Sequence, residues 1–276
     1  MADSTELVRR VIALCPSWDP GDLTNFQFLP GGYSNQNHQF RHRDELFVLR
    51  VPDRIRPFID RELEQSFYKF SAQILVPRIE AFDASTGVMI SHWQSGALLC
   101  ETQVDPSLLV PYLKSLHRAL PPCTRCYDPV ASAREQLSIG DPENAIVEQA
   151  AALVWNPPDT GVCHNDLNPW NIIRTPSGEW MTLDWEWLAV NDPLFDLVTL
   201  HQGLFLDDDI LEELSESLLG DALSEERLRI CLNAFWLREY AWAHAELTQG
   251  NDRDEIHDQL RTSSRKLADL RSQGKV

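Results

Sequence analysis

The polar segment over residues 164–171, together with an aspartate farther along at Asp184, constrains the fold of this chain more than any other feature. The apolar pair Ile172 and Ile173 follows the end of this segment, and residues 171–174 are typical of a short strand. The residues Pro-Ser-Gly at 176–178 favour a turn, and the next apolar run, 180–183, would return as a second strand. We therefore predict a hairpin that brings the end of the polar segment and Asp184 to one edge.

Three side chains of this region have the spacing that phosphoryl transfer needs. Transfer from a nucleotide to a hydroxyl group requires a carboxylate beside the hydroxyl and oxygen ligands for Mg²⁺ on the phosphates. Asp166 can take the first role, and Asn171 and Asp184 can take the second. An H-x-D tripeptide alone arises by chance, but the ordered set with a hairpin between its parts favours a kinase-type site.

The composition is that of a soluble globular protein. The chain has 276 residues, enough for one large domain or two lobes, and 43% of them are hydrophobic. No apolar run approaches the length of a membrane span, and the amphipathic stretch over 7–12 is interrupted by charge. We therefore expect neither a signal peptide nor an anchor, with a cytoplasmic location as the default.

Acidic residues outnumber basic ones in this chain. There are 42 Asp and Glu against 24 Lys and Arg, for a formal charge of −18. Such a balance disfavours nucleic acid and anionic membranes as partners, and it would attract a cationic small molecule. Solubility alone is the simpler explanation of the acidity, so charge by itself does not identify a ligand.

Two of the six cysteines, Cys123 and Cys126, form a C-x-x-C pattern. A zinc site of this kind needs a second cysteine pair or a histidine cluster, and the sequence has neither at a matching spacing. We interpret these cysteines as loop thiols without a metal or redox function.

The sequence before residue 94 predicts a small lobe of sheet and helix. Three strands within 26–52 have a glycine loop after the first, an arrangement that can cover phosphates. A helix follows, with Leu63, Phe67 and Phe70 on one side. The expected elements are strands over 26–29, 36–42 and 46–51, a helix over 60–72, and strands over 76–82 and 88–93.

From Asp105 onward the pattern becomes mainly helical. Three aspartates at 207–209 suit a helix start, and Gly220 and Gly250 suit helix ends. We predict lobes over 1–93 and 94–276, with the boundary within 93–104 and a hinge formed by residues 93–96. The expected elements of the second lobe are a helix after Asp105, a helix within 131–155, a strand over 161–163, the hairpin, and helices over 193–204, 207–219, 224–248 and 252–271.

Several motifs together resemble the aminoglycoside phosphotransferase and choline kinase superfamily, and within it bacterial choline and ethanolamine kinases and the related thiamine kinases. The resemblance extends from about residue 29 to the C-terminal helices, although only the motifs are specific. It implies an α+β, bilobal, protein-kinase-like fold with a small N-terminal sheet lobe and a larger, mostly helical C-terminal lobe. The segments that carry it are LPGGYSNQN (29–37), FVLRVP (47–52), DRELE (60–64), CHNDL (163–167), LDWEW (183–187) and NDPLFDL (191–197).

The resemblance also implies roles for residues on the nucleotide side. Arg50 stands where protein kinases and antibiotic kinases have a lysine, and its planar fork can contact two phosphate oxygens. Glu64 is its expected partner, whereas His164 and Asp196 would support the catalytic loop. The residues expected around ATP are Gly31, Gly32, Ser34, Asn35, Arg50, Glu64, Ser91 and Trp93.

A quaternary ammonium acceptor would need aromatic faces and a carboxylate. Trp236, Glu239 and Tyr240 are spaced to share one face of a helix, which resembles the aromatic C-terminal helix of choline kinases. Aromatic residues at helical spacing are also typical of a core, and we interpret Trp187 and Trp242 in that way. The expected acceptor-binding residues are Glu186, Trp236, Glu239 and Tyr240.

No A-P-E motif or long activation segment follows Asp184, which argues against a protein substrate. We therefore predict an ATP- and Mg²⁺-dependent kinase that phosphorylates a hydroxyl of a small, cationic metabolite, with choline or ethanolamine as the best candidates. A thiamine kinase or an aminoglycoside-type phosphotransferase remains an alternative, as does a nucleotide-binding pseudokinase that acts as a scaffold. Homodimer formation is left open.

Overall fold

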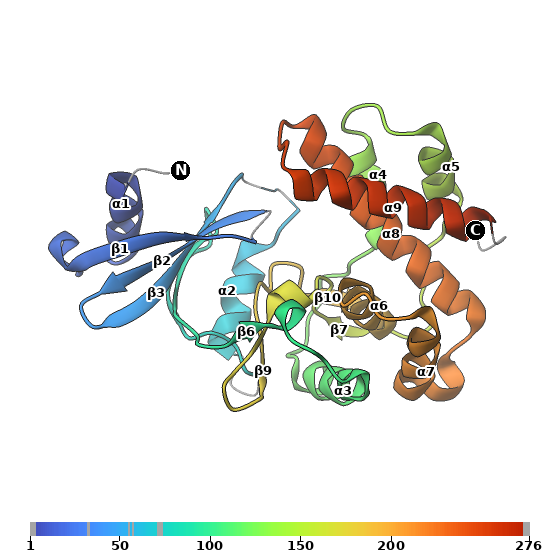
Figure 1. Cartoon of the computed structure of the whole chain (residues 1–276), viewed down its shortest axis with the longest axis horizontal. Coiled ribbons are helices and arrows are strands. Elements are labelled where there is room, and N and C mark those ends of the chain that lie inside the picture. Colours follow the sequence, from blue (N-terminus) through green and yellow to red (C-terminus); the bar gives the residue numbers. More distant parts are fainter. Residues whose placement is uncertain (1–3, 32–33, 55, 57, 71–73, 273–276) are drawn as a thin grey trace. The chain divides into compact units, whose positions relative to one another are not determined.

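Contacts between residues divide the chain into two units, and each unit combines segments that are far apart in the sequence. The structure is a computed structural model that describes residues 4–31, 34–54, 56, 58–70 and 74–272 (Figure 1). The predicted lobe boundary at residues 93 and 94 stays a prediction. The N-terminal unit comprises Met1–Val104, Ala119–Pro121 and Asn168–Leu188, and the C-terminal unit comprises Asp105–Arg118, Pro122–Leu167 and Ala189–Val276.

The N-terminal unit is built on a five-stranded antiparallel sheet with the order β1-β2-β3-β5-β4. All five strands were predicted, although β4 begins at Ile79 and not at residue 76. Its elements are α1 (Ser4–Leu14), the short 3-10 helix η1 (Pro20–Asp22), β1 (Leu23–Leu29), β2 (Asn35–His42), β3 (Glu45–Pro52), α2 (Arg61–Phe70), β4 (Ile79–Asp83), β5 (Val88–His92), β6 (Ala97–Leu98), η2 (Leu99–Glu101), η4 (Pro169–Asn171), β8 (Ile172–Arg174) and β9 (Trp180–Thr182).

The two faces of β3 have different neighbours. Successive side chains of a strand point to opposite faces, so Phe47 and Leu49 share one face and Arg50 lies on the other. Phe47 and Leu49 are buried in a core that includes Val11 of α1, the helix beside β1 in Figure 1. Arg50 instead contacts Glu64 of α2. The strand therefore presents a single cation to the helix on the far side of the sheet.

The predicted helix over 60–72 is present as α2. Phe67 is buried against Trp185, with ring centroids 4.1 Å apart. Phe70, which was predicted to share one side of the helix with Phe67, is 75% exposed. The buried stripe includes Glu64, whose charge a hydrophobic pattern discounts. The helix is thus oriented by a buried carboxylate as well as by an aromatic ring.

The predicted hairpin after the catalytic segment is confirmed. It consists of β8 and β9, and Ile172 pairs with Thr182 at its open end. One residue farther out, the Leu183 amide donates to the Asn171 carbonyl at 2.8 Å. Asn171 and Asp184 therefore lie at the same end of the hairpin, as the sequence indicated. A third strand, β6, follows directly after the predicted hinge at residues 93–96, and it pairs with β8.

The C-terminal unit is mainly helical, which confirms the predicted α+β class. The expected helix within 131–155 is in fact two helices, because Gly140, with a positive φ of 87°, and Pro142 interrupt it. The elements are η3 (Pro106–Leu108), α3 (Leu109–Ala119), α4 (Pro129–Leu137), α5 (Asn144–Ala152), β7 (Gly161–Cys163), β10 (Ala189–Asn191), α6 (Pro193–Gly203), α7 (Asp208–Leu219), η5 (Gly220–Ala222), α8 (Glu225–Thr248) and α9 (Asp254–Ser272).

The long helix α8 forms the centre of this unit. It packs against α4, α6 and α9, so buried residues occur around most of its circumference. Its start is capped by Ser224, whose hydroxyl accepts the Arg227 amide at 3.1 Å. Within the described ranges, no helix has the apolar length required to cross a membrane.

Candidate active site

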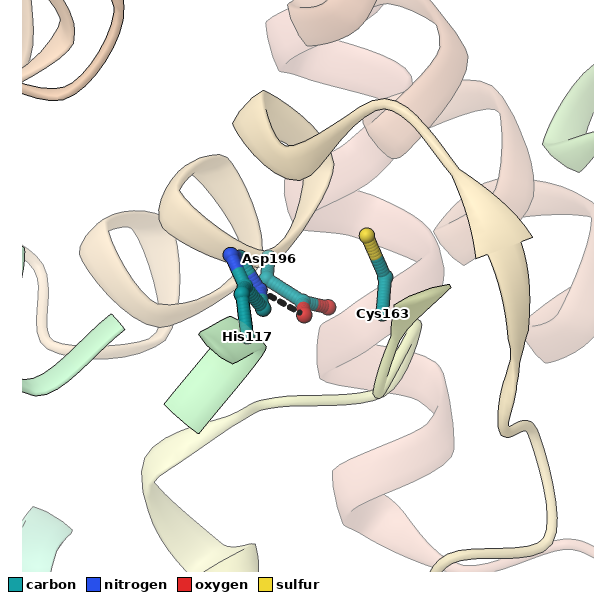
Figure 2. A group of neighbouring side chains, drawn as sticks. All are labelled: His117, Cys163 and Asp196. Atoms are coloured by element: carbon teal, nitrogen blue, oxygen red, sulfur yellow. Dashed lines mark hydrogen bonds and ion pairs between the residues drawn. The ribbon is translucent and has the colours of Figure 1, made fainter. Parts of the chain in front are cut away.

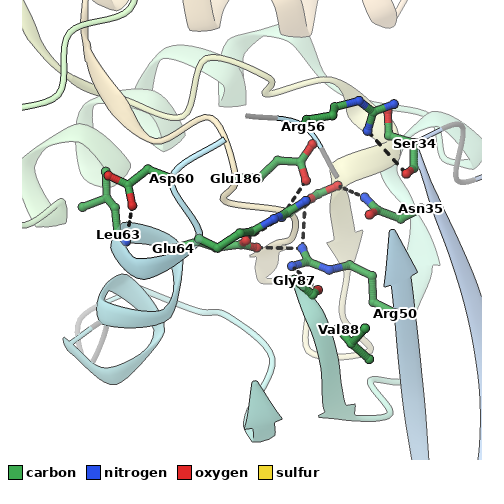
Figure 3. Close-up of polar contacts among 12 residues, drawn as sticks. Ser34, Asn35, Arg50, Arg56, Asp60, Leu63, Glu64, Gly87, Val88 and Glu186 are labelled. Carbon is green, nitrogen blue, oxygen red and sulfur yellow. Dashed lines mark hydrogen bonds and ion pairs between the residues drawn. The ribbon is translucent and has the colours of Figure 1, made fainter. Parts of the chain in front are cut away.

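A buried arginine organises the polar contacts of the N-terminal unit (Figure 3). The Nη1 atom of Arg50 lies 2.7 Å from Oε1 of Glu64 and 3.0 Å from Oδ1 of Asp184. Its Nη2 donates to the Gly87 carbonyl at 3.3 Å. The expected contact between Arg50 and Glu64 is therefore present, and the same guanidinium also reaches a predicted metal ligand.

Charges in this cluster support one another despite their burial. Burial disfavours the charged form of Arg50, but Glu64 and Asp184 together raise its pKa. Burial would likewise raise the pKa of Glu64, whereas Arg50 and Arg61 hold it below its ordinary value. Both groups are thus ionised at neutral pH.

Arg61 extends this arrangement, and sequence reasoning missed its role. Its Nη1 lies 2.7 Å from Oε2 of Glu64 and 2.8 Å from Oε2 of Glu186. We call Arg50, Glu64, Asp184, Arg61 and Glu186 the Arg50 cluster. Glu186 was predicted to bind the acceptor, but it is buried and paired with Arg61 in the N-terminal unit. Its contacts favour a supporting role inside the cluster.

Gly87 leaves the space that Arg61 occupies. A Cβ atom at position 87 would lie 2.6 Å from Nε of Arg61, and the residue has a φ of +75°. The positive φ and the close approach of Arg61 both favour glycine at this position, which lies in the tight turn between β4 and β5. The sequence signalled the turn but not the arginine that lies across it.

The phosphate-loop residues lie before β2 and at its start. Asn35 is buried, and its Nδ2 lies 3.4 Å from Oδ2 of Asp184, a long hydrogen bond. The Ser34 carbonyl accepts from the Asp53 amide at 3.2 Å and from Arg56 at 3.4 Å. Gly31 has a φ of 107°, and a Cβ atom at this position would meet no described atom within 4 Å beyond its chain neighbours. The predicted contact residue Gly32 lies outside the described residues.

The other two residues predicted to lie near ATP are at the end of β5 and just beyond it. Ser91 is buried and pairs with Val48 of β3. The Trp93 amide donates to the Leu46 carbonyl at 2.9 Å, which continues the pairing of the two strands. These residues lie on the strand next to Arg50, and their predicted contacts with a nucleotide stay predictions.

The end of the β8–β9 hairpin fits a magnesium ion. Asn171 offers an amide oxygen and Asp184 a carboxylate, which are hard oxygen donors of the kind that Mg²⁺ takes. The Asp184 side chain is 25% exposed, so a ligand can reach it. Its φ is +55°, a conformation that non-glycine residues adopt mainly at functional sites and turns. In this arrangement Arg50 holds Oδ1 of Asp184, so a metal would compete with that ion pair.

In the C-terminal unit, Asp166 follows a loop whose backbone is firmly held. Oδ1 of Asp196 accepts the Asn165 amide at 2.7 Å, and Oδ2 accepts the His164 amide at 2.9 Å and His117 Nε2 at 2.8 Å. Burial would raise the pKa of Asp196, but the hydrogen bond from His117 and the neighbouring His164 keep it below its ordinary value. These contacts are the ones that a supporting role of Asp196 requires.

His117, Cys163 and Asp196 place potential metal ligands within 4.8 Å of one another (Figure 2). Both carboxylate oxygens of Asp196 already accept N–H groups. Burial raises the pKa of the Cys163 thiol well above its usual value, so the thiolate needed for metal binding is disfavoured. We interpret this group as a brace for the catalytic loop.

A second buried arginine contacts the predicted catalytic residue. Nη1 of Arg238 donates to the Asn165 carbonyl at 2.6 Å, and Nη2 lies 3.4 Å from Oδ1 of Asp166. Its Nε donates to Oε1 of Glu239 at 2.9 Å, and Gln259 donates to Oε2 of Glu239 at 2.6 Å. We call these five residues the Arg238 cluster. Both oxygens of Glu239 are therefore engaged, which does not favour its predicted role as the ligand of an acceptor cation.

The two predicted aromatic acceptor residues are packed inside the C-terminal unit. Trp236 is 5% exposed and lies against Phe235, with Lys266 5.8 Å from its ring centroid. Tyr240 is 2% exposed, and its hydroxyl accepts the Glu143 amide at 3.4 Å. The contacts favour the core interpretation for both side chains, which the sequence could not separate from an aromatic cage.

The two tryptophans that were assigned to the core are only partly buried, so their core assignment stays a prediction. Trp187 is half-buried and stacks on Phe58, with ring centroids 5.4 Å apart. Trp242 is half-buried on α8. Cys123 and Cys126 are free thiols in the segment before α4, as expected.

Known proteins share both sequence and fold with this chain. The profile of the phosphotransferase enzyme family matches residues 25–230. Protein LicA of Haemophilus influenzae is 23% identical over 256 residues, which span 80% of this chain and 74% of that protein. A crystal structure of LicA in complex with AMP superposes with a TM-score of 0.75 at 18% identity, covering 97% of this chain and 99% of the other. The crystal structure of choline kinase LicA from Streptococcus pneumoniae gives a TM-score of 0.73 at 19% identity, covering 96% and 99%.

These matches confirm the predicted superfamily and the kinase-like fold. The structural likeness extends over nearly the whole of this chain, including the units that carry the Arg50 and Arg238 clusters. The family match includes the predicted phosphate loop, the hairpin and Asp196. The chain therefore belongs to the phosphotransferase enzyme family and is an enzyme of that class.

Proposed function

We propose that this phosphotransferase uses ATP and Mg²⁺ to phosphorylate the hydroxyl group of a small cationic alcohol, with choline and ethanolamine as the leading acceptors. The observation that carries the proposal is the Arg50 cluster, in which a buried guanidinium contacts both Glu64 and Asp184. In kinase chemistry a cation at this position holds the α and β phosphates, and a neighbouring aspartate binds the metal.

On the nucleotide side, Arg50 presents a planar fork that suits phosphate oxygens. Glu64 holds the guanidinium from α2, and Arg61 holds Glu64 in turn, so the fork is aligned before a nucleotide arrives. Asn171 and Asp184 would bind Mg²⁺. When bound, the metal supplies positive charge to the β- and γ-phosphate oxygens as charge redistributes in the transition state. Phosphates would draw Arg50 away from Asp184 and expose the carboxylate for this task.

On the acceptor side, Asp166 would orient the hydroxyl group and receive its proton. Its side chain is 28% exposed, which permits contact with a substrate. The preceding backbone is held by Asp196, which accepts the amides of His164 and Asn165, so the carboxylate is positioned with little freedom. Alignment of this kind, rather than strong proton abstraction, would supply much of the rate.

The identity of the acceptor rests on charge and on relatives. The formal charge of −18 favours a cation, and a structural neighbour is a choline kinase. Trp236, Tyr240, Glu186 and Glu239 do not support the choice, because all four are engaged in internal contacts. Thiamine and aminoglycosides, which are also cationic, therefore remain alternatives to be tested.

A panel of acceptors tests the proposal. Purified full-length protein would be given Mg²⁺-ATP with choline, ethanolamine, thiamine, homoserine or an aminoglycoside, and ADP release would be followed by a coupled assay. We expect the highest kcat/KM with choline or ethanolamine, and a new phosphate monoester signal in ³¹P NMR.

Ethyltrimethylammonium is the matched control, since it keeps the cation of choline but lacks the hydroxyl group. It should bind without producing a monoester. Efficient transfer to thiamine or an aminoglycoside, with none to the amino alcohols, would contradict the proposed acceptor and leave the phosphotransferase chemistry in place.

A further inference from the structure

Arg238 stands out among the buried charges that the proposed chemistry does not yet use. Its guanidinium lies beside two aromatic rings of the C-terminal unit, 5.3 Å from the centroid of Phe195 and 5.5 Å from that of Phe235. Burial disfavours its charge, but Glu239, Tyr127 and Asp166 together raise its pKa. The side chain is therefore a permanent cation that the surrounding rings keep in one orientation.

The donors of Arg238 divide between the loop and its own helix. Nη1 binds the carbonyl of Asn165, the residue directly before Asp166. Asn165 has a φ of +68°, and its own amide is held by Asp196. The peptide that leads into Asp166 is thus fixed by contacts on both sides, which an unfavourable backbone conformation needs in order to persist.

The contact with Asp166 itself is looser than the contact with Glu239. Nη2 of Arg238 lies 2.5 Å from Oε1 of Glu239 but 3.4 Å from Oδ1 of Asp166. A tight bidentate pair with Asp166 would occupy both carboxylate oxygens and weaken it as an acceptor of a hydroxyl proton. Because Glu239 takes the closer position, Arg238 orients Asp166 through one oxygen without neutralising it fully.

We propose that Arg238 is the positioning residue for Asp166. Glu239 sets the orientation of the Arg238 guanidinium and does not bind the acceptor. This inference rests on the proposed function, because it assumes that Asp166 receives the hydroxyl group. It assigns Glu239 of α8 to the support of the catalytic loop and removes it from the set of expected acceptor ligands. Gln259 of α9 completes the arrangement by donating to the second oxygen of Glu239.

The test replaces the ion pair of Arg238 and Glu239 by two neutral amides. Arg238→Gln alone would leave Glu239 without its cation and could prevent folding, so the double variant Arg238→Gln/Glu239→Gln is the principal protein. We expect kcat to fall on the order of 100-fold, because the carboxylate loses its alignment. KM for ATP should stay within about twofold, since a group that aligns the transition state contributes to kcat and not to nucleotide binding.

Arg229→Gln is the matched control. Arg229 is on the same helix, and its side chain approaches Glu226 at 3.9 Å. This variant should keep the wild-type kcat. A double variant that is folded, as judged by circular dichroism, and that keeps kcat within threefold of wild type overturns the proposal.

Amide hydrogen exchange tests the same contact without turnover. In the double variant, peptides that cover residues 163–168 should exchange faster than in wild type, whereas Arg229→Gln should leave them unchanged. If wild type transferred phosphate to no acceptor, the proposed function would fail while this measurement still decided the positioning role. Unchanged exchange in the double variant overturns the inference independently of any assay of activity.

Discussion

The two units carry similar charge clusters that differ in the origin of the central glutamate. In each cluster a buried arginine is shared between a glutamate and an aspartate predicted to take part in the reaction. In the N-terminal unit, Arg50 lies on β3, and Glu64 comes from α2. The second contact, to Asp184, is short at 3.0 Å. The Arg50 guanidinium thus contacts Glu64 of a different element and Asp184, which is a predicted metal ligand.

In the C-terminal unit, the glutamate is the next residue on the same helix. Arg238 and Glu239 are consecutive in α8, and the contact of Arg238 with Asp166 is longer, at 3.4 Å. Both arginines donate to a backbone carbonyl, Arg50 to Gly87 at 3.3 Å and Arg238 to Asn165 at the shorter distance of 2.6 Å. Among the described residues, Arg50 also lies near one aromatic ring and Arg238 near two. We propose that the first arginine exchanges partners when a nucleotide binds, and that the second keeps its contacts.

Removal of the shared aspartate of the first cluster should have the largest effect. Asp184→Ala deletes the predicted metal ligand, and we expect kcat/KM to fall about 1,000-fold or more with every acceptor. Arg50 keeps Glu64 as a partner, so the variant should remain folded. The measurement is the coupled ADP assay with circular dichroism as a control. Wild-type turnover by a folded Asp184→Ala protein would refute the proposed metal role.

The two glutamates should differ in their contribution to stability. Glu64 binds Arg50 and Arg61 and is buried, so Glu64→Gln should lower the free energy of unfolding by about 3 kcal/mol. Glu239→Gln should cost less than about 1 kcal/mol, because an amide can still hydrogen-bond with Arg238 and Gln259. Urea unfolding at pH 7 measures both. Equal losses would show that the clusters are alike in energy as well as in composition.

Acidification should change the stability contributions of the same two glutamates in opposite directions. Although burial opposes it, Arg50 and Arg61 lower the pKa of Glu64, so its stabilisation is present above the unfolded value of 4.5 and is lost as pH falls through the lower folded pKa. Burial raises the pKa of Glu239. Its contribution to folding stability is therefore greatest below pH 4.5, the unfolded pKa, and is lost as pH rises through the higher pKa of the folded state. The stability advantage of wild type over Glu64→Gln should therefore shrink in acid, while that over Glu239→Gln should grow. Urea unfolding of the three proteins between pH 7 and pH 4 checks this, and parallel curves would contradict it.

A smaller effect should come from the glycine beneath Arg61. Gly87→Ala adds a Cβ atom 2.6 Å from Nε of Arg61 in a residue with positive φ, and we expect a loss of about 2 kcal/mol in unfolding free energy. Gly178→Ala is the control, since its φ is +88° but nothing lies within 4 Å of its Cβ position. That variant should lose only the backbone component, about 1 kcal/mol. If the two variants lost the same unfolding free energy in urea, the close approach of Arg61 would make no measurable contribution to stability.

Most of the Arg50 cluster could be predicted from the sequence, because its residues lie in segments with local patterns. Arg50 and Glu64 lie in separate segments with recognisable patterns, and their pairing followed from the resemblance to kinases. The hairpin was predictable because its turn residues and apolar runs are local features, so Asn171 and Asp184 were placed correctly at one end. Arg61 was missed, because its partner Glu186 is distant in the sequence and nothing local indicates the contact.

The contacts of the Arg238 cluster could not be predicted from the sequence. Consecutive residues on a helix normally point in different directions, so the sequence offered no reason to pair Arg238 with Glu239. The helical spacing of Trp236 and Tyr240 was predicted correctly, but spacing does not tell whether a face meets a ligand or another helix. The answer depended on α4 and α9, whose packing against α8 is a property of the folded unit.

The most direct measurement of the central claim is the rate of phosphate transfer to choline by Asp166→Asn. This change keeps the shape of the side chain and the contact with Arg238 but removes the group that would receive the hydroxyl proton. We predict that kcat falls by about 100-fold or more while the affinity for Mg²⁺-ATP, measured by calorimetry, is unchanged. An Asp166→Asn protein that transfers phosphate at the wild-type rate would contradict the account.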